Sequence, residues 1–258
     1  MPNPVQHFLN VTTSTLASSV AAWRGTMVLR EAEKPKIALK LFEFEGCPYC
    51  RAVREALTAL HLDADIYPCP KNGSRFRDEA LRLGGKMQFP LLVDENQKLV
   101  LYESADIITH LFQTYAKQDV PLYYQKTFFK DQLSGVATAL RGGAGIFSRP
   151  SRAPAEPLHL WSFESSPFSR LVRERLCELE IPYHLHNVGK ERWEDIGPAV
   201  FRLKPGTYEP VSGGKRAEHF ARTGHMQVPY LEDPNTGAQL LESSVILDYL
   251  DKEYSAAQ

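Results

Sequence analysis

Two stretches of the chain share one pattern: Leu41-Phe-Glu-Phe-Glu-Gly-Cys-Pro-Tyr-Cys-Arg-Ala-Val-Arg-Glu-Ala-Leu57 and Leu160-Trp-Ser-Phe-Glu-Ser-Ser-Pro-Phe-Ser-Arg-Leu-Val-Arg-Glu-Arg-Leu176. The offset between them is 119 residues, from residue 41 to residue 160. In the second copy, serines replace both cysteines of the first copy's Cys-Pro-Tyr-Cys. A fixed internal repeat identifies the folding unit, so the chain contains two related units, of which one can perform dithiol chemistry.

The repeat continues downstream of these motifs. Gly85-Lys-Met-Gln-Phe-Pro90 matches Gly224-His-Met-Gln-Val-Pro229, and the pair Glu103-Ser104 matches Glu242-Ser243. The spacing from proline to glutamate is the same in both copies. The second copy has about 20 extra residues before its proline, among them Lys204 to Pro210, and an insertion of this size is usually a functional or mobile loop.

Composition limits the class of protein. With 258 residues, 43% hydrophobic and 24% charged, the chain has room for two globular domains. Thirty basic and 31 acidic side chains leave no net charge to attract nucleic acid. We find no apolar run of about 18 residues that would span a bilayer. We therefore expect a soluble or at most peripheral protein.

The cysteines indicate a reducing compartment, since two of the four form a C-x-x-C motif rather than a disulfide scaffold. We expect a cytoplasmic protein. The first 30 residues lack acidic side chains, so an organelle transit segment is the alternative. However, Leu9, Leu16 and Trp23 recur at near-helical spacing, which predicts an N-terminal helix packed on the first unit.

Local patterns predict the same elements in each copy. In the first copy, a strand over Ile37–Phe44, a helix over Pro48–Leu60 and a strand over Ala64–Tyr67 form a β-α-β unit. A further helix, a hairpin and a last helix starting near Ser104 follow. The predicted domains are an N-terminal helical extension (1–36), a first domain (37–112), a helical connection with a Gly/Pro-rich linker (113–157) and a second domain (158–254).

The start of the first motif helix is where reactive chemistry is expected. A cysteine at a helix N-terminus meets unpaired N–H groups and the positive end of the helix dipole, both of which favour the thiolate. Cys47 is therefore the candidate nucleophile, and Cys50, one turn later, is close enough to form a disulfide with it. Arg51 and Arg54 either add positive potential or form the solvated face of the helix. Cys177 is expected to be buried and inert, whereas Cys69 is either an exposed thiol or the end of a strand.

Two further pairs are candidate ligand contacts. Pro90 and Pro229 each begin a strand, where a cis bond would free the preceding residue's backbone for an extended peptide, although an edge strand opening on proline is the simpler interpretation. The Glu-Ser pairs precede helices, where serine caps the helix or the pair holds an amino-acid-like ligand.

Together these residues resemble the thioredoxin-fold module shared by glutaredoxins and the N-terminal domain of glutathione transferases, over about 37–112 and 158–254. Cys-Pro-Tyr-Cys is similar to the glutaredoxin active site, and Glu-Ser to the transferase motif that holds the γ-glutamyl end of glutathione. The resemblance implies an α/β fold with two tandem thioredoxin-like domains, each a mixed four-stranded sheet flanked by helices. It also implies a glutathione site in the first domain at Tyr49, Phe89, Pro90, Glu103 and Ser104, and a possible second-domain site at Ser166, Val228, Pro229, Glu242 and Ser243.

The chain departs from both families. Phe44 stands where glutaredoxins commonly have lysine, and we expect no all-helical domain of the kind that follows the transferase module. The leading hypothesis is a glutathione-dependent thiol-disulfide oxidoreductase in which Cys47 attacks and Cys50 resolves, while the second domain binds glutathione or serves as a scaffold. The alternatives are a transferase that conjugates glutathione to electrophiles through Ser166, and a non-catalytic module binding glutathione or an iron–sulfur cluster.

The expected partners follow from the leading hypothesis. They are glutathione, as cosubstrate, and disulfide or glutathionylated substrates. No metal is expected, because a structural zinc site needs four ligands and only Cys47 and Cys50 are grouped. Since related transferases dimerise, we also expect the two domains to form an intramolecular pseudo-dimer.

Overall fold

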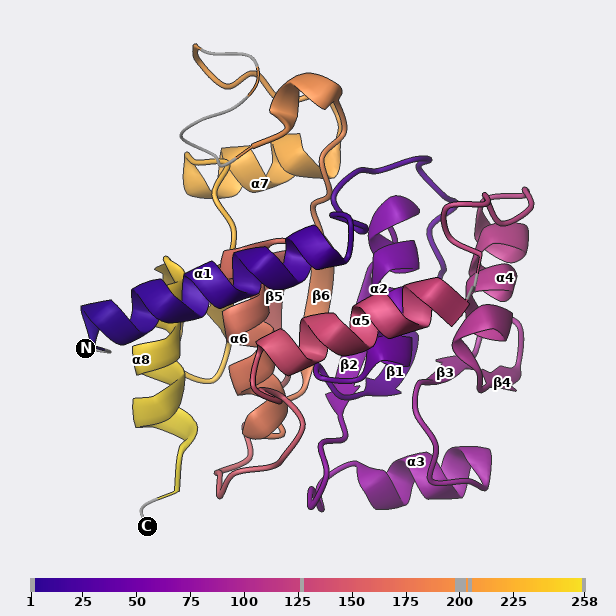
Figure 1. Ribbon diagram of the computed structural model, residues 1–258, viewed down its shortest axis with the longest axis horizontal. Helices are drawn as coiled ribbons and strands as arrows, with labels where there is room; N and C mark the ends of the chain where they lie inside the picture. The colour runs from indigo at the N-terminus through magenta and orange to yellow at the C-terminus, as the bar shows by residue number, and fades with distance from the viewer. Residues whose placement is uncertain (1–2, 126–127, 198–202, 204–205, 257–258) are drawn as a thin grey trace.

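The computed structural model describes residues 3–125, 128–197, 203 and 206–256. Repeat one, residues 4–115, contains α1 (Pro4–Val20), β1 (Leu39–Glu43), α2 (Pro48–Ala59), β2 (Ala64–Pro68), α3 (Arg77–Gly84), β3 (Leu91–Asp94), β4 (Leu99–Leu101) and α4 (Ser104–Tyr115). Repeat two, residues 128–254, contains α5 (Phe128–Leu140), β5 (Leu158–Ser162), α6 (Pro167–Glu178), β6 (Tyr183–Asn187), the 3₁₀ turn η1 (Trp193–Asp195), α7 (Lys215–Thr223), β7 (Tyr230–Asp233), β8 (Ala238–Leu241) and α8 (Ser243–Tyr254). The predicted mixed α/β class is confirmed (Figure 1).

The strands of both repeats form one sheet. Its order is β4-β3-β1-β2-β6-β5-β7-β8, with β2 and β6 antiparallel and Ala64 opposite Leu185. Two separate four-stranded sheets were predicted, and this expectation differs from the structure. Separated from each other, the two halves would expose β2 and β6 as edge strands with unpaired N–H and C=O groups. Pairing β2 with β6 satisfies these two inner edges.

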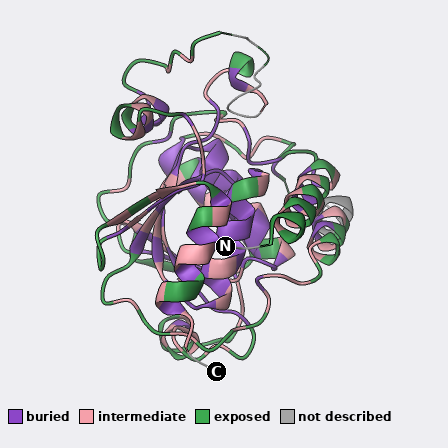
Figure 2. Ribbon diagram, turned by 90° about the vertical axis from the view of Figure 1, so that its left-hand side faces the viewer, coloured by how far each residue is buried: buried purple, intermediate pink, exposed green. Residues whose placement is uncertain are grey.

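One hydrophobic core runs through both repeats, on one face of the sheet. Leu41 of β1 and Leu57 of α2 belong to the same buried cluster as Leu160 of β5 and Leu176 of α6. Figure 2 shows the buried helices on one side of the strands. On the other face, α3 and α7 each cover a smaller cluster at opposite ends of the sheet. No helix in the described residues is long and apolar enough to cross a membrane.

The N-terminal helix was predicted to pack on the first unit through its apolar residues, and this was wrong. Its packed face is small and polar, with Ser14, Ala17 and Ser18 buried, whereas Leu9 and Leu16 are exposed. Ser14 Oγ donates a hydrogen bond to the Pro167 carbonyl oxygen at 2.8 Å. Thus α1 packs on the first turn of α6, in repeat two, as Figure 1 also shows.

Helix α5, which precedes the second motif in the chain, packs in turn on the start of the first motif. Thr138 Oγ1 donates to the Gly46 carbonyl oxygen at 3.1 Å, and Gly46 N–H donates to the Gly145 carbonyl oxygen at 3.2 Å. In the matching contact of repeat two, Ser165 N–H donates to the Gly25 carbonyl oxygen, also at 3.2 Å. The repeat therefore includes the helix before each motif, and each helix crosses to the other repeat's motif.

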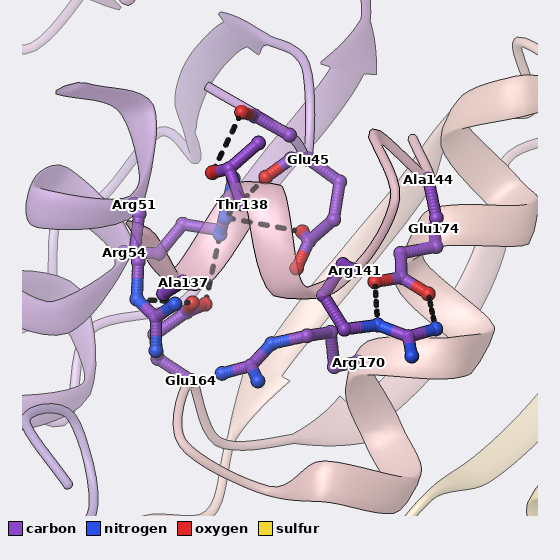
Figure 3. Close-up of a pocket in the computed structure, with 11 residues that line it drawn as sticks. Glu45, Arg51, Arg54, Ala137, Thr138, Arg141, Ala144, Glu164, Arg170 and Glu174 are labelled. Atoms are coloured by element: carbon purple, nitrogen blue, oxygen red, sulfur yellow. Dashed lines mark hydrogen bonds and ion pairs between the residues drawn. The ribbon is translucent and has the colours of Figure 1, made fainter. Parts of the chain in front are cut away.

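Four buried charged groups lie where the repeats meet. Arg54 Nε lies 2.8 Å from Glu164 Oε2, and Arg173 Nη2 lies 3.0 Å from Glu45 Oε1, so each arginine crosses to the other repeat. Arg173 also lies 3.0 Å from Glu164. Arg54 is only 1% exposed, which rules out the solvated-face alternative, and its positive charge helps to lower the pKa of Cys47. Figure 3 shows Arg54 directed toward Glu45 and Glu164.

The Glu164 carboxylate remains ionised through its arginine partners. Burial alone raises the pKa of Glu164, but the guanidinium groups of Arg173 and Arg54 outweigh that effect and lower it to about 2. An ionised carboxylate in an apolar interior is tolerated only when it is paired and hydrogen-bonded. Removing one partner therefore leaves the remaining buried charges uncompensated.

We predict that Glu164→Gln lowers the free energy of unfolding by about 3–5 kcal/mol, the usual cost of removing one partner from a buried ion pair. The control is Glu95→Gln, which removes the half-exposed partner of Lys40 and is expected to cost less than about 1 kcal/mol. Urea denaturation at neutral pH measures both. Equal effects of the two substitutions would contradict the role given to this cluster.

Candidate functional site

The turn from β1 into α2 positions the first motif. Cys47 is the N-cap of α2, with extended backbone angles (φ −81°, ψ 121°), and Pro48 occupies the first helical position, where a missing N–H costs nothing. The Cys47 sulfur accepts a hydrogen bond from Cys50 N–H at 3.2 Å. The sulfur therefore takes the place of a capping oxygen, and its negative charge is favoured there.

The two thiols are electrostatically different. The hydrogen bond from the Cys50 side chain, helped by the N–H groups of Cys50 and Tyr49, lowers the pKa of Cys47 below its ordinary value despite burial. Burial raises the pKa of Cys50 well above its ordinary value, and Cys47 and Glu43 raise it further. Cys47 is thus suited to attack as a thiolate, and Cys50 to remain a protonated thiol.

Glu43 ends β1 and lies beneath the motif. Burial raises the pKa of its carboxyl to about 8, although Arg54 acts in the opposite direction. Glu43 was not singled out in the sequence, where a glutamate at a strand end reads as a solvated residue. Its counterpart Ser162 is also buried and accepts a hydrogen bond from Arg173 at 3.0 Å.

The other predicted residues of repeat one are connected to the motif by a chain of contacts. Cys47 N–H donates to the Phe44 carbonyl oxygen at 3.0 Å, and the Phe44 ring meets Phe89 edge to face at 6.3 Å. The Phe89–Pro90 peptide bond is cis. Gln88, beside it, donates to Glu103 Oε1 at 2.5 Å.

Ser104 begins α4 and is buried, whereas Glu103 before it is exposed. Glu103 and its counterpart Glu242 both have positive φ, 61° and 70°. Such angles are uncommon for residues with a side chain and cluster at functional sites. Within the motif, Tyr49 is 44% exposed while both cysteines are buried. Tyr49 is therefore the exposed residue of the motif.

Arg77, which the sequence patterns did not single out, lies against Phe89. It donates to the carbonyl oxygens of Cys69 and Pro70, and its guanidinium lies 5.1 Å from the centre of the Phe89 ring. The internal repeat offered a signal, because Arg216 occupies the position that matches Arg77. Arg216 also donates to a backbone carbonyl oxygen, that of Val188, at 2.9 Å.

Repeat two presents the same geometry with hydroxyl groups. Ser166 caps α6, Ser169 Oγ donates to Ser166 Oγ at 2.9 Å, and the Val228–Pro229 bond is cis. Gln227 pairs with Glu242 as Gln88 does with Glu103. In addition, His7 Nε2 from α1 lies 3.4 Å from Ser243 Oγ, at the start of α8. Helix α1 therefore contacts Ser243, one of the predicted ligand positions of repeat two.

The remaining cysteines are not exposed thiols. Cys69 follows β2 and is buried, and burial raises its pKa. Cys177, predicted to be buried, donates to the Gly145 carbonyl oxygen and accepts from Glu45 N–H, each at 3.3 Å. Both thiols therefore serve the fold.

Two further regions do not form part of the site. A cavity of about 20 Å³ beside Gly46 is lined by Arg51, Arg141 and Arg170, and has room for about one water molecule. Glutathione does not fit there. In the second-copy insertion, Lys204 and Pro205 lie outside the described residues, and 206–214 form neither helix nor strand.

A family model described as glutathione S-transferase, N-terminal domain, matches the chain twice, over residues 41–119 and 160–258. The matched segments cover more than half of the chain and include one motif each. Comparisons with curated proteins and with solved structures found no match.

We predict that iodoacetamide alkylates Cys47 with a pH midpoint below that of an ordinary thiol, because its lowered pKa populates the thiolate at lower pH. Cys50→Ala removes the principal hydrogen bond and shifts the midpoint upward, whereas Cys50→Ser retains a donor and shifts it less. Peptide mapping follows Cys47, with buried Cys177 as internal reference. A Cys47 midpoint at or above the ordinary value would refute this assignment.

Proposed function

Because the chain belongs to the glutathione S-transferase N-terminal domain family in both repeats, we propose that it is a glutathione-dependent thiol-disulfide oxidoreductase acting through repeat one. The observation that supports this most directly is the pair of unlike thiols at the start of α2: a pKa lowered at Cys47 and raised at Cys50. An attacking thiolate beside a protonated resolving thiol is what disulfide exchange requires.

The proposed reaction consists of two exchanges. The Cys47 thiolate attacks the glutathione sulfur of a glutathionylated substrate, forms a Cys47–glutathione disulfide and releases the substrate thiolate. A second glutathione thiolate then attacks the glutathione sulfur of that mixed disulfide, which yields oxidised glutathione and regenerates the Cys47 thiolate. Alternatively, Cys50 loses its proton and attacks Cys47, which releases reduced glutathione and closes a Cys47–Cys50 disulfide that glutathione later reduces. Electrons and sulfur atoms balance on both routes.

Glutathione is proposed to lie between the motif and the start of α4. By resemblance to the family, the backbone of Phe89 pairs with its cysteinyl residue, while Glu103 and Ser104 hold its γ-glutamyl end. The N-terminus of α4 adds N–H donors for the α-carboxylate of the γ-glutamyl residue. Tyr49, the exposed residue of the motif, is proposed to border the thiol.

Repeat two is proposed to be a scaffold for repeat one. Helix α1 is hydrogen-bonded both to the second motif, at the Pro167 carbonyl oxygen, and to Ser243. Conjugation through Ser166 is therefore the weaker alternative. We further propose that the repeats form an intramolecular pseudo-dimer. The β2–β6 pairing supports this, as do helices α1 and α5, each of which packs on the motif of the other repeat.

We predict that Cys47→Ser abolishes reduction of a glutathionylated peptide and that Cys50→Ser retains part of the activity by the monothiol route. Ser166→Ala should retain all of it. A coupled glutathione reductase assay measures each rate. Full activity in Cys47→Ser, or loss of activity in Ser166→Ala with normal folding, would refute the assignment to repeat one.

A matched pair of substitutions tests where glutathione binds. In a Cys47→Ser background, Ser104→Ala should weaken glutathione binding about 10- to 100-fold, the equivalent of a lost hydrogen bond to a charged group. Ser243→Ala, the same change in repeat two, should leave binding unaltered because α1 already contacts that serine. Isothermal titration calorimetry distinguishes the two, and the reverse ranking would place glutathione in repeat two.

A further inference from the structure

A group of metal-ligating side chains lies away from the thiols, on the sheet face opposite α2 and α6. Along β2 and β6, Ala64 and Leu185 point into the core. Since side chains alternate along a strand, Asp63, His184 and His186 point to the other face. Asp63 precedes β2 in repeat one, while the two histidines lie on β6 in repeat two.

These three side chains converge. One potential ligand atom from each lies within 4.8 Å of the others, and all three residues are half-buried. The strand register explains the convergence: Asp65 is opposite His184, so Asp63, two residues earlier, meets His186 across the antiparallel pair. The seam between the repeats therefore assembles the group, and no local sequence motif announces it.

Each imidazole is oriented by a partner on one ring nitrogen. His184 Nδ1 lies 2.6 Å from Asp65 Oδ1, and His186 Nε2 lies 3.1 Å from His159 Nδ1. The Trp161 ring stacks on His186 with centroids 4.0 Å apart. Metal-binding histidines typically have such an outer partner, which sets the ring orientation and leaves the second nitrogen for the ion.

Asp63 is also fixed in position. Its Oδ1 accepts from Asn187 N–H at 2.8 Å and from Lys215 Nζ at 2.7 Å. Its second oxygen is the ligand candidate. Two positive charges, the Lys215 ammonium and the Arg222 guanidinium, act on His186, while the carboxylates of Asp63 and Asp65 supply negative charge at the site.

The donor set indicates the class of ion. Two imidazoles and one carboxylate suit a divalent first-row transition ion such as Zn²⁺ better than Mg²⁺ or Ca²⁺, which prefer oxygen ligands alone. The site does not follow the internal repeat, because the positions matching His184 and His186 in repeat one are Asp65 and Tyr67. It is therefore a property of the assembled pair.

We propose that Asp63, His184 and His186 bind one divalent transition-metal ion that links the two repeats across the β2–β6 seam. A bound ion stabilises the folded state by mass action, since the unfolded chain does not bring these ligands together.

The test is zinc titration of metal-free protein carrying Cys47→Ser and Cys50→Ser, which removes thiol ligands. Calorimetry should give one Zn²⁺ per chain, and saturating Zn²⁺ should raise the melting temperature. His184→Ala and His186→Ala should each weaken binding at least about 10-fold, as should the conservative Asp63→Asn, which serves if an alanine variant fails to fold. His225→Ala, an exposed histidine outside the group, is the control.

X-ray absorption of the zinc complex should show nitrogen and oxygen ligands without sulfur. The proposal is overturned if the Cys47→Ser, Cys50→Ser protein binds no zinc. It is equally overturned if His184→Ala, His186→Ala and Asp63→Asn all bind zinc as tightly as His225→Ala.

Discussion

The buried charge cluster is the constraint on which the rest of the structure depends. Glu45 and Glu164 each lie two residues before a motif's first residue, and each pairs with an arginine from the other repeat's motif helix. Both of these pairs span the two repeats, so separating the repeats would remove a buried partner from each carboxylate. The cluster therefore links the start of α2 to the start of α6. The position of Cys47, at the start of α2, therefore depends on this cluster.

Around this shared frame the repeats differ in their chemistry. Ser166 and Ser169 retain the capping geometry of Cys47 and Cys50, with a hydroxyl where a thiolate would form. The exchanged helices also contact their targets differently. Helix α5 holds Gly46, just before the first motif, whereas α1 holds Pro167 within the second motif and reaches Ser243. Both differences agree with a reactive repeat one supported by repeat two.

Local structure was predictable from the sequence, because strand, turn and helix signals are short-range. The helix beginning at Pro48, the helix beginning at Ser104 and the strand after Pro90 lie where the pattern indicated. Long-range relations were not predictable. The burial of Arg54 could not be predicted from its helix alone, because its partner Glu164 lies 110 residues away in the chain. The alternation Tyr-His-Leu-His-Asn in β6 indicates only a half-buried strand, and the residues opposite the histidines depend on which edge strands pair.

The most direct test of the central claim is the site of glutathione attachment. Cys50→Ser protein is incubated with oxidised glutathione, digested and mapped by mass spectrometry under conditions that preserve disulfides. Our account predicts one glutathione per chain, attached to Cys47, with Cys69 and Cys177 unmodified. Attachment at Cys69 or Cys177 while Cys47 remains free would contradict it.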